Sequence, residues 1–124
     1  MGTRFICTLE CQAHENYNRK IIEAHDRATV VVGASFGHPV RSIRGSFVRR
    51  LEELERLGIS EQEFVTAGAG TLRAAMVDGD IDHGSVMAGQ SAGIVNDIIP
   101  VRDLVERTVA EAEAIMRRSV ELII

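Results

Sequence analysis

The residues of this chain that are best suited to hold a phosphate are a short pair near its beginning, Gly2 and Thr3. At the C-terminal end of a strand, such a pair offers two free backbone N–H groups and a hydroxyl, and this combination can bind an anion. By itself the pair is a weak signal. It predicts a phosphate site only where an independent feature supports it.

A second segment with a suggestive spacing runs from Gly84 to Ser91 and nearly spells a P-loop. That motif requires a lysine, then Ser or Thr, after its second glycine. Here Gln90 replaces the lysine, and a neutral amide brings no positive charge to the β- and γ-phosphates. Tight packing of small residues explains the segment without a nucleotide, with Gly89 and Gly93 letting a neighbouring backbone approach closely.

Cysteine and histidine side chains are the other candidates for chemistry. On a helix, Cys7, Cys11 and His14 would share one face and present zinc-binding atoms. A fourth ligand is not evident nearby, so we interpret the cysteines as small buried hydrophobic residues. The four histidines lack the Ser, Asp or Cys spacing of a catalytic triad. The sequence therefore predicts neither a metal site nor a catalytic residue.

The elements that must position these residues are mostly helices. Apolar spacing and capping signals predict five of them: residues 16–25, residues 45–57, a short helix from Ser60, residues 71–77, and a helix from Pro100. Three consecutive valines predict a short strand within residues 28–34, and residues 4–8 read as the end of a strand or the loop after it. Two such strands cannot form a stable sheet alone. Either the domain is mostly helical, or the other strands of the sheet are missing.

Two of these helices carry a clear apolar face. The stripe of the first is Phe47, Leu51, Leu54 and Leu57, with Gly58 placed to end the helix. Ser60 and Glu63 form a capping-box pattern for the helix that follows. The last helix keeps one apolar face over about six turns. Its residues are Val101, Leu104, Val105, Thr108, Ala112, Ile115, Met116 and Ile123.

Composition narrows the class of protein. The 124 residues fit one domain, and 45% hydrophobic with 26% charged residues is ordinary for a globular protein. The net charge of -4 argues against nucleic-acid binding. A cluster of arginines at Arg41, Arg44, Arg49 and Arg50 is followed at once by glutamates, which is typical of a solvated helix face. Without a membrane-spanning or signal segment, a cytoplasmic protein with reduced cysteines is expected.

Five segments together carry a resemblance to a known family. They resemble, in register, the end of nitronate monooxygenases and FMN-dependent enoyl-acyl carrier protein reductases. The match covers nearly the whole chain, and the Met-Ala-Gly-Gln run is its most specific part. The segments are residues 1–5 with 13–20, residues 36–44, residues 68–70, residues 78–80 and residues 85–93.

The resemblance implies an α/β fold in which residues 1–124 form the C-terminal segment of one FMN-binding TIM barrel. That segment comprises the end of the last strand, the following helices and a small helical addition, with one or two short strands. Such barrels need about 250 residues. Gly2 and Thr3 would lie at strand eight and hold the FMN phosphate, where barrels commonly bind phosphate. Met87 and Gln90 would lie near the flavin or the substrate.

The sequence also departs from the family pattern. The family's catalytic histidine lies in an upstream Gly-Gly-His segment that has no match here, and the glycine-rich loop after strand seven is missing too. His38 and His83 occupy different motifs. We therefore hypothesise a truncated reading frame or a fragment that is inactive alone.

Two functions follow from these observations. The first is part of an oxidoreductase in which NAD(P)H or a nitronate reduces FMN, which then passes electrons to an enoyl thioester or to oxygen. Residues 36–44 lean towards the reductase. The alternative is a non-catalytic helical module that binds a partner protein or self-associates. A homo-oligomer or the missing barrel half is a possible partner in either case. Apolar surface left by a lost barrel, and Leu122, Ile123 and Ile124, would support the alternative.

Overall fold

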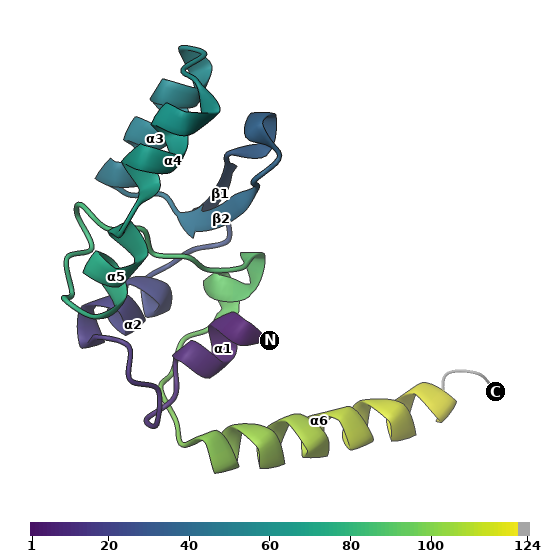
Figure 1. The fold of residues 1–124 in the computed structure, drawn as a ribbon. Helices are drawn as coiled ribbons and strands as arrows, with labels where there is room; N and C mark the ends of the chain where they lie inside the picture. Colours follow the sequence, from purple (N-terminus) through teal and green to yellow (C-terminus); the bar gives the residue numbers. More distant parts are fainter. Residues whose placement is uncertain (122–124) are drawn as a thin grey trace.

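The computed structural model describes residues 1–121, which form helices around one two-stranded hairpin (Figure 1). The elements in chain order are α1 (Gly2–Ile6), α2 (Glu15–Ile22), β1 (Thr29–Val32), the 3-10 helix η1 (Ala34–Phe36), β2 (Val40–Ile43), α3 (Ser46–Arg56), α4 (Glu61–Gly68), α5 (Thr71–Met76), the 3-10 helix η2 (Gln90–Ile94) and α6 (Val101–Glu121). In these residues no helix is both long and apolar enough to cross a membrane.

The predicted strand within residues 28–34 is confirmed as β1, which pairs antiparallel with β2 from Thr29 opposite Ile43 to Val32 opposite Val40. The strand or loop predicted for residues 4–8 is wrong over most of its length, because α1 continues to Ile6. The helical spacing explains the difference. Thr3 and Cys7, four residues apart, both point inward and are 8% and 0% exposed.

The helix predictions are confirmed, with small shifts at the ends. Residues 45–57 form α3, which ends before Gly58 in a left-handed conformation with φ 74°. Ser60 and Glu63 form the complete capping box that begins α4. Within the stripe of α3, Leu51 is buried, whereas Leu57 is 70% exposed because it lies at the C-cap.

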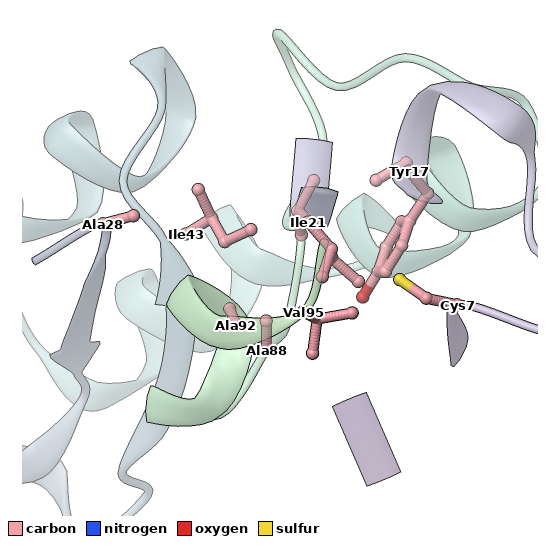
Figure 2. Close-up of a cluster of buried hydrophobic side chains, with 10 residues drawn as sticks. Cys7, Tyr17, Ile21, Ala28, Ile43, Ala88, Ala92 and Val95 are labelled. Atoms are coloured by element: carbon pink, nitrogen blue, oxygen red, sulfur yellow. The ribbon is translucent and has the colours of Figure 1, made fainter. Parts of the chain in front are cut away.

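Two groups of buried side chains hold the chain together. We call the first the central cluster; α1, α2, α5, β2 and η2 contribute to it, as Figure 2 shows for most of its members. Its buried residues are Cys7, Tyr17, Ile21, Ala28, Ile43, Ala75, Val86, Ala88, Ala92 and Val95. The second, the hairpin cluster, lies between the hairpin and the pair α3 and α4. Its buried residues are Val32, Val48, Leu51 and Phe64.

The last helix differs from the others. In Figure 1, α6 runs away from the rest of the chain as a long arm. Of its predicted apolar face, Leu104 is 3% exposed, but Ile115 and Met116 are 53% and 62% exposed. Ile123, and with it the range 122–124, lies outside the described residues.

Candidate functional site

The segment from Val86 to Gly89 runs beside β2 and is fixed to it by backbone hydrogen bonds. The amide of Ile43 donates to the carbonyl of Val86 at 2.8 Å, and the amide of Ala88 donates to the carbonyl of Arg41 at 3.2 Å. Ser42 and Met87 form an antiparallel bridge between these bonds. The predicted site residue Met87 therefore lies on a rigid backbone, with its side chain half-buried.

Two side chains from the beginning of the chain hold the same segment from another side. The hydroxyl of Tyr17 donates to the carbonyl of Met87 at 2.8 Å, and the amide of Gly89 donates to the Oγ1 of Thr3 at 2.8 Å. Tyr17 is fully buried, and this burial raises the pKa of its hydroxyl to about 12. The hydroxyl thus remains a proton donor at neutral pH.

The structure brings the four predicted site residues into one region. Thr3 is hydrogen-bonded to Gly89, between Met87 and Gln90, and Gln90 begins η2 with an exposed side chain. The fourth, Gly2, is the exposed first residue of α1. Because α1 is a helix, Gly2 and Thr3 form its first turn, and they do not end a strand.

This helical start presents the same groups that the pair would offer at the end of a strand. The first hydrogen bonds of α1 run from the amides of Arg4 and Phe5 to the carbonyl of Met1, so the amides of Gly2 and Thr3 precede them and lack a helical acceptor. No atom lies within 4 Å of a Cβ built on Gly2, so its backbone is open to approach. The Thr3 hydroxyl accepts from Gly89 but keeps its own proton to donate. These donors fit a phosphate.

Sequence reasoning missed the residues that fix this region to α6. Arg4 bonds the carbonyl of Asp97 at 2.7 Å and pairs with its carboxylate at 2.7 Å, and Arg107 pairs with the same carboxylate at 3.0 Å. The hydrogen bond from Arg107, together with the charge of Arg4, holds the pKa of Asp97 below its usual range. Pairs 93 residues apart leave no local pattern in a sequence. Tyr17 lies in the helix predicted for residues 16–25, but its partner, the carbonyl of Met87, is 70 residues away and was not predictable.

Comparison with known proteins decides the family. The sequence profile described as nitronate monooxygenase matches residues 1–111. The chain belongs to the nitronate monooxygenase family. Members of this family are TIM-barrel oxidoreductases that depend on FMN, so the predicted fold class is confirmed: the helices and the hairpin of residues 1–121 correspond to part of such a barrel.

Individual relatives agree with this assignment. FabK from Thermotoga maritima is 39% identical, with a TM-score of 0.88 over 95% of this chain and 37% of that chain. A methionine-to-alanine mutant of FabK from the same organism is 36% identical, with a TM-score of 0.80 over 95% of this chain and 35% of that chain.

A curated relative from Mycobacterium tuberculosis carries the name "(3aS,4S,5R,7aS)-5-hydroxy-7a-methyl-1-oxo-octahydro-1H-indene-4-carboxyl-CoA dehydrogenase". It is 26% identical over 149 residues, which cover 90% of this chain and 42% of that protein. The chain thus spans about two fifths of the length of the relatives it matches.

Outside this region, the other groups in residues 1–121 with possible chemistry are potential metal ligands and the cysteines. Among these residues, no three His, Cys, Asp or Glu side chains are grouped to hold a metal ion. Cys7 is buried, and burial raises the pKa of its thiol, which keeps it protonated and weakly nucleophilic. The donors at the start of α1 and the rigid segment at Met87 therefore remain the best-defined candidate site.

Proposed function

We propose that residues 1–124 are the C-terminal segment of a single barrel in an FMN-dependent oxidoreductase, and that Gly2 and Thr3 hold the FMN phosphate. The observation that carries this proposal is the hydrogen bond between Thr3 and Gly89, which brings Gly2 and Thr3 beside the segment of Met87 and Gln90 in a chain that belongs to an FMN-dependent family. When bound, FMN accepts electrons from a donor and passes them to a substrate.

The role of the chain in this proposal is to bind and orient the cofactor. The amides of Gly2 and Thr3 donate to phosphate oxygens, and the hydrogen bond between Thr3 and Gly89 keeps the phosphate site in register with the segment that carries Met87 and Gln90. Met87 lines the flavin or substrate pocket with its thioether, and Gln90 offers an exposed amide beside it. The sequence contains no Gly-Gly-His segment, so we expect no turnover from the chain alone.

The substrate class in this proposal is a nitronate or an enoyl thioester, with NAD(P)H as the reductant in the second case. The name of the Mycobacterium tuberculosis relative includes a carboxyl-CoA group, and FabK is the similar solved structure. The carboxyl-CoA group in the first name favours the thioester.

A titration of FMN and riboflavin with the purified chain, followed by flavin fluorescence, tests the phosphate site. The two flavins differ only in the phosphate, so we expect FMN to bind at least about tenfold more tightly, which corresponds to one or two charge-assisted hydrogen bonds. Thr3→Ala should reduce this preference. Thr108→Ala is a matched control, because that hydroxyl bonds only within α6.

Equal binding of FMN and riboflavin, or binding that Thr3→Ala leaves unchanged, would contradict the phosphate site. A chain that binds no flavin but forms an oligomer in sedimentation would favour the alternative, a helical interaction module. The observation in favour of that alternative is the exposed apolar face of α6, whose side chains at Val109, Ile115, Met116 and Val120 are all more than half exposed.

A further inference from the structure

A hollow of about 310 Å³ opens where the last turn of α2, the end of β2 and the first turns of α3 meet. Four of the chain's 14 Lys and Arg residues line it, although the chain as a whole carries a net charge of -4. They are Lys20, Arg27, Arg44 and Arg49. A concave surface lined by one sign of charge raises the local concentration of oppositely charged ligands.

Three of these cations are free to bind a ligand. Within residues 1–121, no carboxylate forms an ion pair with Lys20, Arg27 or Arg49. Arg44 is held by both oxygens of Glu52, at 3.0 and 3.2 Å. Glu23 also lines the hollow and reduces its charge without neutralising it.

We propose that this basic hollow binds the terminal phosphate monoester of a nucleotide-like ligand. A guanidinium donates two parallel N–H groups to phosphate oxygens, and an ammonium adds a compact charge, so two arginines and a lysine together match a dianionic phosphate. The proposal rests on the proposed function for the source of the ligand. The source is either the 3′-phosphate of a coenzyme A thioester or the 2′-phosphate of NADPH.

Ile43 connects the hollow to the candidate site, whose own residues do not line it. Ile43 lines the hollow, and the amide of Ile43 donates to the carbonyl of Val86, the residue before Met87. A Cβ on Gly93 of η2 would lie 2.8 Å from the backbone carbonyl carbon of His25 and from the amide nitrogen of Asp26, so η2 packs directly against the loop that carries His25, a lining residue of the hollow. An elongated ligand with its reacting end near Met87 can therefore place a distant phosphate here.

Calorimetric titration of the chain with two ligand pairs tests this proposal. The pairs are coenzyme A with dephospho-coenzyme A, and NADPH with NADH; each pair differs by one phosphate monoester. We expect at least about tenfold tighter binding of the phosphorylated member of one pair, and a preference that weakens with added salt. The pair that discriminates identifies the source of the phosphate.

Charge reversal connects this preference to the hollow. The double variant Lys20→Glu with Arg49→Glu should bind both members of each ligand pair equally. Its circular dichroism spectrum should be unchanged, because neither side chain is buried. Arg50→Glu is the matched control, since Arg50 follows in α3 but lines a different hollow with Thr71 and His83. Binding of none of the four ligands, equal binding within both pairs, or a preference that survives the double reversal would overturn the proposal.

The flavin titration separates this result from the proposed function. A phosphate preference without FMN binding would support the hollow and contradict the FMN site at α1. FMN binding with equal binding inside both ligand pairs would support the FMN site and contradict the hollow, because the two sites use different residues.

Discussion

Helices α3 and α6 both carry an apolar stripe, but the stripe is buried in α3 and largely exposed in α6. Each has an apolar stripe at helical spacing with charged residues on its other face. In α3, Val48 and Leu51 are 1% and 5% exposed because the hairpin and α4 cover them. In α6, only its beginning is covered, and Ile115 is 53% exposed.

The difference shows what an apolar stripe predicts. It predicts that a helix forms and which face seeks a partner, but it does not identify the partner. For α3 the partners are adjacent in the chain. For α6, Leu104 is the one side chain that residues 1–121 bury, and Val101 and Thr108 are half-buried. The stability of the two helices should therefore depend on their stripes to very different degrees.

The largest difference between the two helices is expected when one side chain of each stripe is replaced by alanine. Leu51→Ala should lower the free energy of unfolding by about 2–5 kcal/mol, because it leaves a cavity in the hairpin cluster. Ile115→Ala should lower it by less than about 1 kcal/mol, because its side chain is already largely in water. Urea unfolding followed by circular dichroism measures both. Equal losses would mean that the α6 stripe is also covered in solution.

A smaller loss of stability is expected from glycine-to-alanine substitutions in the turn between β1 and β2, which packs against α3. Gly33 has φ +77°, and a Cβ there would lie 2.5 Å from the carbonyl oxygen of His38. Gly37 has nearly the same φ, +76°, but no atom within 4 Å of its Cβ position. Gly37→Ala should cost about 1 kcal/mol for the left-handed conformation alone, and Gly33→Ala more than that. If thermal unfolding shows equal losses, the close packing of the turn is not needed for stability.

The smallest expected effect is on how the free energy of unfolding changes with pH. Glu55 of α3 accepts the amides of Gly33 and Ser35 at 2.9 and 3.1 Å, and the hydrogen bond from the Ser35 side chain is the main cause that lowers its pKa below 4.5. A lowered folded-state pKa means that this stabilisation is present above the ordinary value and is lost as the pH falls through the lowered one.

The matched variant is Glu55→Gln, which should lower stability at neutral pH and make stability less sensitive to acid as the pH falls below 4.5. Glu53→Gln is the control, since Glu53 is exposed on the same helix. Unfolding curves at several pH values measure the effect. An unchanged acid dependence would show that the carboxylate does not hold the turn.

Local signals account for what the sequence predicted. Three elements were predictable because their signals lie within a few residues of one another. These signals are the capping box at Ser60, the valines of β1 and the apolar stripe of α3. The strand β2 was missed because Val40 to Ile43 includes Arg41 and Ser42, whose burial depends on the distant segment at Met87. The prediction for residues 4–8 was wrong because a run of four apolar or small residues, Phe5 to Thr8, fits a buried strand and a helix equally well.

The candidate site was predictable only through the family resemblance. Gly2, Thr3, Met87 and Gln90 came from motifs in register, and the structure then brought Thr3 to Gly89. The contacts of Tyr17 and Arg4 join distant parts of the chain, and no spacing rule finds such pairs. Whether these residues hold FMN stays a prediction.

The hydrogen bond between Thr3 and Gly89 also has a consequence for the order of folding. It joins residues 86 positions apart, and the bonds from Arg4 to Asp97 and from Leu9 to Ile99 close loops of similar length. Closing such loops costs entropy before any contact compensates for it. The hairpin and α3 can form early from neighbouring residues. The contacts of α1 with Gly89 and Asp97 can form only after the 86 to 93 residues that separate these partners have been synthesised.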